Sequence, residues 1–123
     1  MSVSTALDGL KTILEANGYT VMTTGDEYRD AHCTVKQTHV VPVYQENATW
    51  HNGIFRVVLM DKIKPRDRHV SEKTAAARVE AVIKALKDGY TAFAVQLIID
   101  GASTSEESGF RVTEMEITAI YAV

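Results

Sequence analysis

The chain has 123 residues, enough for one domain and too few for a separate cofactor-binding domain beside a substrate domain. Hydrophobic residues make up 46% and charged residues 24%, a balance that excludes disordered, collagen-like and coiled-coil chains. The 13 lysines and arginines are outnumbered by 16 aspartates and glutamates, so the basic excess of a free-standing nucleic-acid-binding domain is missing.

Cysteine use and the N-terminal sequence predict a cytoplasmic protein. The single cysteine, Cys33, has no partner for an intramolecular disulfide, as is usual in a reducing compartment. The first residues lack the basic and apolar regions of a signal peptide, and no run approaches the ~18 apolar residues of a membrane helix. We therefore expect no membrane association.

The N-terminal part of the chain predicts a helix. Leu7, Leu10 and Leu14 share one helical stripe, which predicts a helix over 4–17 that ends at Gly18. An extended segment over 19–23 and a polar loop over 25–31 should follow it.

Three segments in the middle of the chain predict a β-hairpin. Residues 33–44 alternate in polarity like a half-buried strand, and Pro42 marks an edge or a bulge because it lacks an N–H donor. Residues 45–53 are predicted as the hairpin connection, with Asn52-Gly53 suited to positive φ. The apolar run 54–60 predicts a central strand that is covered on both faces.

The second half of the chain begins with the one concentration of positive charge. Four of the thirteen cations fall within residues 61–69. The next helix should begin with Ser71 as its N-cap and end at Gly89. The remaining predicted elements are a strand over 93–99, a polar loop over 101–109 and a strand over 110–123. This order predicts one α+β domain over residues 1–123, with two helices packed on one face of a mainly antiparallel sheet.

No complete catalytic site is visible in the sequence. Cys33 lacks a base, since His32 would point to the opposite strand face and His39 lies roughly 20 Å along the strand, so we predict a small buried hydrophobe. The histidines lack the spacing of a zinc site, and the glycines form no phosphate loop. Glu114 and Glu116 lie about 6.6 Å apart on one strand face, a separation found between catalytic carboxylates. We favour instead an acidic stripe that lines a channel or a subunit contact.

Several features indicate assembly with other proteins. Trp50, the only tryptophan, is predicted at a hairpin tip, where a large apolar ring suits an interface. The segments 45–53 and 101–109 would project as arms, and the basic loop of residues 62–68 could meet acidic residues of a neighbouring subunit. The predicted interface residues are Trp50, Lys64, Arg66, Arg68, Glu106, Glu107, Glu114 and Glu116.

The order of elements resembles the tail terminator (tail completion) family of long-tailed bacteriophages. The resemblance consists of the helix around Ala6-Leu7-Asp8-Gly9-Leu10, a hairpin, the strand Ile54–Met60, the helix Ser71–Lys87 and the strand Phe110–Val123. It spans nearly the whole chain. It is a pattern of elements without a diagnostic motif, so no residue role is transferred.

The resemblance implies a structural virion protein without catalysis, cofactor or metal. Such a protein forms a hexameric ring on the end of the tail tube, stops tube polymerisation and provides the surface for head-tail joining. Its partners would be copies of itself, the tail tube protein and a head-tail connector or neck protein, with DNA passing through the lumen without specific binding. It would be assembled in the host cytoplasm and reside in the tail or neck of the virion.

Two other functional hypotheses stay open. The first is a different head-tail joining protein, such as a neck or head-closure component. The second is a small oligomeric α+β enzyme whose site lies between subunits, with Glu114, Glu116 or His39 contributed to a neighbour's pocket.

Overall fold

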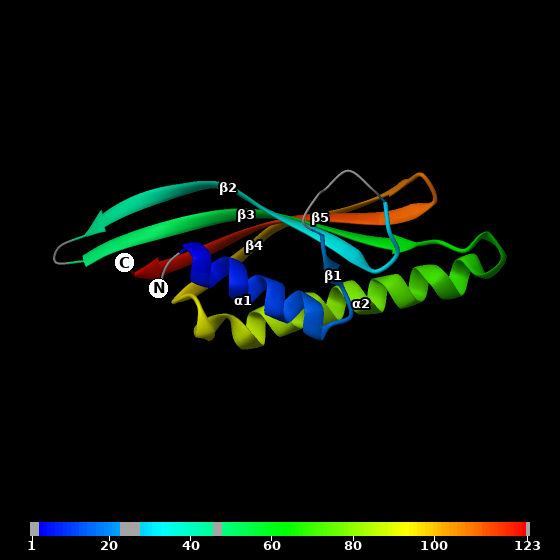
Figure 1. The fold of residues 1–123 in the computed structure, drawn as a ribbon, viewed down its shortest axis with the longest axis horizontal. Coiled ribbons are helices and arrows are strands. Elements are labelled where there is room, and N and C mark those ends of the chain that lie inside the picture. The colour runs from blue at the N-terminus through cyan, green and yellow to red at the C-terminus, as the bar shows by residue number, and fades with distance from the viewer. Residues whose placement is uncertain (1–2, 23–27, 46–47, 123) are drawn as a thin grey trace.

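The computed structural model describes residues 3–22, 28–45 and 48–122, with side chains described outside 36–49. Within these ranges, two α-helices and five β-strands form the fold (Figure 1), and the short 3-10 turns Pro65–Asp67 and Tyr90–Ala92 precede and follow the second helix. The elements in chain order are α1 (Val3–Ala16), β1 (Thr20–Val21), β2 (His32–Gln45), β3 (Ala48–Lys62), α2 (Arg68–Gly89), β4 (Gln96–Glu107) and β5 (Phe110–Ala122).

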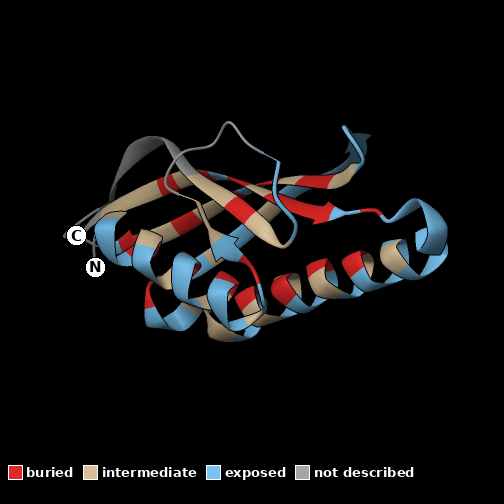
Figure 2. Cartoon of the chain, turned by 45° about the vertical axis from the view of Figure 1, so that its right-hand side comes forward, coloured by how far each residue is buried: buried red, intermediate tan, exposed pale blue. Residues whose placement is uncertain are grey.

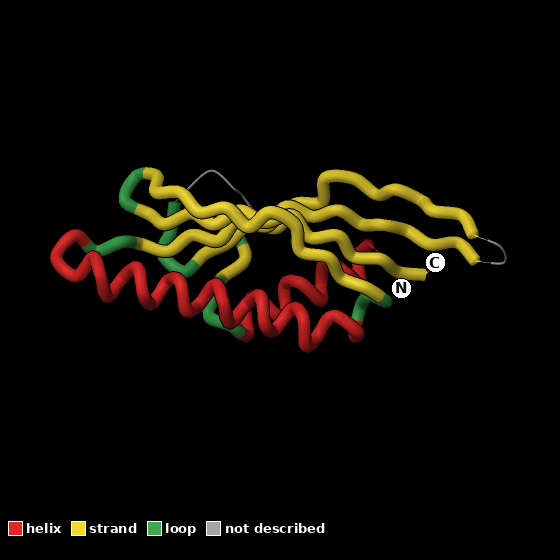
Figure 3. The backbone as a smooth tube through the Cα atoms, turned by 180° about the vertical axis from the view of Figure 1, so that it is seen from behind, coloured by secondary structure: helices red, strands yellow, loops and turns green. Residues whose placement is uncertain are grey.

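The five strands form one sheet in the order β1-β2-β3-β5-β4. Strand β1 pairs with β2 in parallel, and every other pairing is antiparallel, so the sheet is mixed. Both helices pack against the same face, as Figures 1 and 3 show from opposite sides. The predicted α+β class is confirmed, as is the placement of two helices on one face.

The core lies between this face and the helices. Strand alternation points Phe55, Val57 and Leu59 of β3 toward the helices, and all three are buried. The same face of β5 and the apolar stripes of the helices complete the core (Figure 2) with Leu10, Leu14, Val79, Val82, Leu86, Met115, Ile117, Ala119 and Tyr121. We call the opposite face, which carries the even-numbered residues of β3 and β5, the outer face.

The predicted helices are confirmed, with differences at their ends. Gly18 has a φ of 91° and ends α1 in the expected left-handed conformation. Helix α2 begins at Arg68, so Ser71 is not its N-cap, and the Ser71 hydroxyl accepts a hydrogen bond from the backbone N–H of Lys64. Gly89 has a φ of −114° and leads into a 3-10 turn, so it is no left-handed terminator.

Two predicted loops are wrong, because their polar segments form parts of strands. Strand β3 starts at Ala48, so most of the predicted connection 45–53 is strand. Strand β4 starts only at Gln96, after the 3-10 turn, and runs through the predicted loop to Glu107, where Ser108 and Gly109 turn the chain at positive φ. The segment 100–107 can be hydrophilic and still be a strand because all of its residues are exposed and β4 forms the edge of the sheet.

Strand β3 lies between β2 and β5, which confirms its central position. Only one of its faces is covered by helices, since Arg56 is exposed and Val58 is half-buried on the outer face. The edge prediction for Pro42 is also confirmed. The two-residue β1 reaches only His32 and Cys33, and Pro42 pairs with β3 alone within the described sheet.

Gly9 lets α1 lie directly on the ring of Phe93. A Cβ atom at Gly9 would overlap this ring, with its Cγ only 2.7 Å away. Gly9→Ala should therefore lower the free energy of unfolding by about 1–2 kcal/mol, because overpacking exceeds the gain in helix propensity. Urea unfolding checks this, with Gly89→Ala as control, since its Cβ would meet only Ile13 Cδ1 at 3.6 Å. An equal effect of both changes would contradict the packing.

Candidate interaction surfaces

A charged band crosses the outer face of the sheet. The backbone register places Arg56 beside Glu116 and Glu116 beside Asp100, across three neighbouring strands. Glu114 lies on the same face, where its Oε1 accepts from Arg56 Nη2 at 2.7 Å. Within the described part of the chain, neither Glu116 nor Asp100 has an ion-pair partner. Among the described side chains, the band thus combines three carboxylates with one guanidinium, and two of these carboxylates have no ion-pair partner among the described residues.

The predicted acidic stripe is therefore only partly acidic. Glu114 and Glu116 share one face, as their spacing predicted, but Arg56 neutralises Glu114. Neither Arg56 nor Asp100 was predicted from the sequence as part of this surface. Strand alternation alone cannot say which residues of other strands lie beside Glu116, because that depends on the register of three strands.

Apolar residues continue the outer face beyond the charged band. Ile98, two positions before Asp100 on β4, is 39% exposed. Trp50 is half-buried in β3, in register with Ala122. Its predicted position at a hairpin tip is wrong.

Strand β3 continues through Asn52-Gly53, and the glycine serves side-chain packing there instead of a turn. A Cβ atom at Gly53 would lie 3.0 Å from Phe55 Cε2 and 3.1 Å from Tyr121 Cε1. The dipeptide therefore allows close approach of two buried rings and forms no turn.

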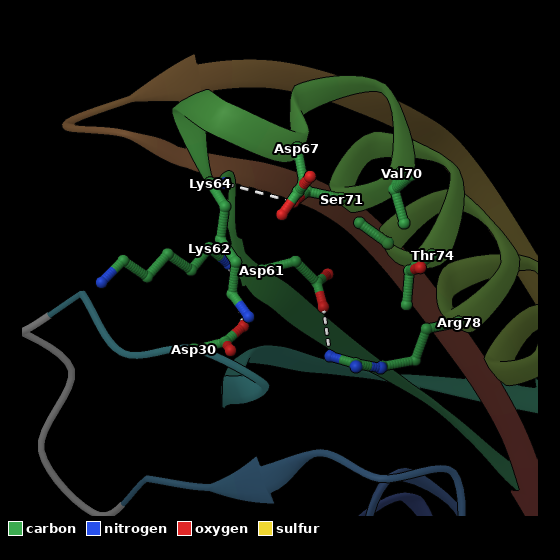
Figure 4. A pocket seen from close by; sticks show the side chains of 10 residues that line it. Asp30, Asp61, Lys62, Lys64, Asp67, Val70, Ser71, Thr74 and Arg78 are labelled. Atoms are coloured by element: carbon green, nitrogen blue, oxygen red, sulfur yellow. Dashed lines mark hydrogen bonds and ion pairs between the residues drawn. The ribbon is translucent and has the colours of Figure 1, made fainter.

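The junction between β3 and α2 forms a basic tip, which we define as Lys62, Lys64 and Arg66. All three are exposed, and none has an ion-pair partner among the described residues. Val70 follows on the first turn of α2 and is 62% exposed. Val70 and Lys64 line one cleft of about 200 Å³, and Figure 4 shows Asp67 and Ser71 between them.

Arg68, predicted with the basic tip, is engaged within its own chain. Its guanidinium binds both carboxylate oxygens of Glu106, with Nη1 to Oε1 at 3.2 Å, and its Nη2 lies 3.1 Å from Glu72 Oε1. The hydrogen bond from Arg68 holds the pKa of Glu106 below its usual range. Pairing of Arg68 or Glu106 with another subunit, as predicted from their charges, would require this ion pair to break.

Glu107 lies apart from the other predicted acidic residues. Its Oε2 accepts a hydrogen bond from the Tyr28 hydroxyl at 2.7 Å, which raises the pKa of Tyr28. Tyr28 also stacks on Phe110, with 5.5 Å between the ring centroids. Glu107 thus holds the segment before β2 against the β4–β5 turn. The four predicted glutamates occupy three separate places.

A buried polar network lies beside the cleft. Asp61 is almost fully buried and accepts hydrogen bonds from the Tyr19 hydroxyl at 2.7 Å and from Arg78 Nη1 at 2.6 Å. The guanidinium of Arg78 also lies 5.5 Å from the centroid of the Tyr19 ring. Burial raises the pKa values of Asp61 and Tyr19. Since both oxygens of Asp61 are engaged, the network connects β3, α2 and the segment after α1.

No three His, Cys, Asp or Glu side chains among the described residues could hold a metal ion. Neither helix in the described ranges is long and apolar enough to cross a membrane. Cys33 is fully buried, which confirms its prediction as a small core residue, and burial raises the pKa of its thiol to about 12.

The burial of Cys33 makes its thiol a reporter of unfolding. At pH 8 the native thiol should react with a thiol-specific reagent at least about a hundredfold more slowly than in urea, because reaction requires an exposed thiolate. A chromogenic disulfide reagent measures both rates. Equal rates would place Cys33 at the surface.

The fold of the chain is similar to that of solved structures. No family model and no curated protein matches the chain. Among solved structures, a chain described as "Virion of native gene transfer agent (GTA) particle" has a similar fold, with a TM-score of 0.52 and 12% sequence identity. The match covers 93% of this chain and 84% of that chain. At this identity the two chains share a fold.

Proposed function

We propose that this protein is a structural component of a phage-like virion and forms a ring on the end of the tail tube. The observation that carries the proposal is the fold match to a chain of a virion particle, which covers most of both chains. In this role the ring stops polymerisation of the tube and presents the surface to which a head-tail connector or neck protein attaches.

The charge distribution supports an assembling subunit. A ring needs two unlike surfaces on each copy, because a heterologous contact closes only after a fixed rotation. The basic tip and the outer face provide unlike surfaces on separate parts of the chain. The ring acts without catalysis, cofactor or metal, and DNA passes through its lumen without specific binding. The protein is assembled in the host cytoplasm and resides in the tail or neck.

Tube capping is the direct test. Tail tubes are assembled from the tube protein of the same phage, with and without this protein, and examined by electron microscopy. We expect a cap at one end of each tube and a limit on further growth. Binding to head connectors without binding to tubes would instead support a neck or head-closure protein.

A further inference from the structure

We propose that ring subunits join through the basic tip of one copy and the outer face of the next. This inference rests on the proposed ring. Each surface combines an exposed aliphatic residue with charges of one sign that have no ion-pair partner among the described residues. The tip also carries one exposed carboxylate, Asp67, so its three cations outnumber its one anion. The tip combines Val70 with Lys64 and Arg66, and the outer face combines Ile98 with Asp100 and Glu116.

The charges proposed for the contact are those that form no ion pair among the described residues of the same chain. Arg68 is bound to Glu106 and Arg56 to Glu114, so neither pair needs a neighbour. Lys64, Arg66, Asp100 and Glu116 have no ion-pair partner among the described residues. Contact between the two surfaces would pair positive with negative charge, while contact of either surface with itself would juxtapose like charges.

Geometry prevents the two surfaces from meeting within one chain. Along β3 the basic tip begins at Lys62, six residues beyond Arg56 in the charged band, a distance of roughly 20 Å. The tip lies at the end of the sheet where α2 starts (Figure 1). The charged band lies on the face opposite the helices. The basic tip of one copy can therefore contact the outer face only of a second copy, and repetition of this contact gives a head-to-tail ring.

Each surface also contributes an apolar side chain to the contact, Val70 beside the tip and Ile98 on the outer face. Val70 and Ile98 are among the most exposed large hydrophobic residues of the described chain, at 62% and 39%. Burying such side chains at the centre of a contact, with charges around them, is the usual arrangement of a protein interface. The outer face thus binds the tip of a neighbouring copy.

The test uses two charge-reversed variants of the full chain, a tip variant (Lys64→Glu with Arg66→Glu) and a face variant (Asp100→Lys with Glu116→Lys). Each should reduce the ring fraction at least about tenfold, because like charges then face each other. An equimolar mixture should restore rings, since each reversed surface meets its complement in alternate subunits. Light scattering in the presence of tail tubes measures the ring fraction.

Matched controls carry the same charge changes on exposed positions of α2. Lys73→Glu with Lys84→Glu matches the tip variant, and Glu80→Lys with Asp88→Lys matches the face variant. Both controls should form rings like the unmodified chain. If the unmodified chain forms rings and the tip and face variants do so equally well, this contact is wrong and the proposed function stands. If the unmodified chain forms no ring even with tubes, both proposals fail.

Discussion

Replacement of Asp61 by alanine is expected to lower the free energy of unfolding by about 3 kcal/mol. The change leaves the hydroxyl of Tyr19 and the guanidinium of Arg78 without their shared acceptor, the almost fully buried carboxylate of Asp61. The value lies at the low end for a broken buried ion pair because the Arg78 side chain retains 28% exposure. Urea unfolding followed by circular dichroism measures it.

Tyr19→Phe separates the two contacts of Asp61. It removes one hydrogen bond and keeps the pairing with Arg78, so we expect a loss of about 1.5 kcal/mol. A change of less than 0.5 kcal/mol for Asp61→Ala, on the order of a neutral surface substitution, would show that the network adds no stability.

Asp61 should also make the free energy of unfolding depend on pH. Because burial raises its pKa, the folded protein holds this proton at a pH where the unfolded chain has released it. The linked stability is present below the usual aspartate pKa of about 3.9 and is lost as the pH rises through the folded value. The stability difference between the unmodified chain and Asp61→Asn should therefore fall as the pH is raised from about 3.9. A difference that rises over this range would reverse the assigned direction.

Replacement of Phe55 by alanine should have the largest effect on stability, a loss of about 4 kcal/mol. Phe55 is fully buried on the central strand and belongs to the cluster formed by both helices and β5. Truncation leaves a cavity that this surrounding structure can fill only in part. Thermal and urea unfolding both measure the loss.

The neighbouring residues Val57 and Val58 give a matched control. Val57 is buried against the helices and Val58 is half-buried on the outer face, so the same Val→Ala change samples opposite faces of β3. We expect Val57→Ala to cost about 2 kcal/mol and Val58→Ala to cost under about 1 kcal/mol. The reverse order would place the helices on the other face of the sheet.

Local periodicity carried most of the fold prediction. The stripe of Leu10 and Leu14 and the alternation around Ile117 each follow from residues close in sequence, and both segments form the expected elements. The missed strand segments have polar sequence and little burial. Residues 103–107 extend β4 because each of them pairs with a residue of β5, and no pattern within the segment itself shows this.

The interaction residues were less predictable because their roles depend on long-range pairing. Arg68 and Glu106 lie 38 positions apart, and their ion pair depends on the return of β4 beside the start of α2. The network of Tyr19, Asp61 and Arg78 left no signal in the sequence for the same reason. Charge counts could find the basic tip, but they could not separate paired from unpaired charges.

The native mass of the purified protein, measured by light scattering with and without tail tubes, tests the central claim most directly. The proposed function predicts a hexamer that caps the tubes, or a monomer that becomes a ring only on tube ends. A monomer or dimer that stays unchanged when tubes are added would contradict a tube-capping ring.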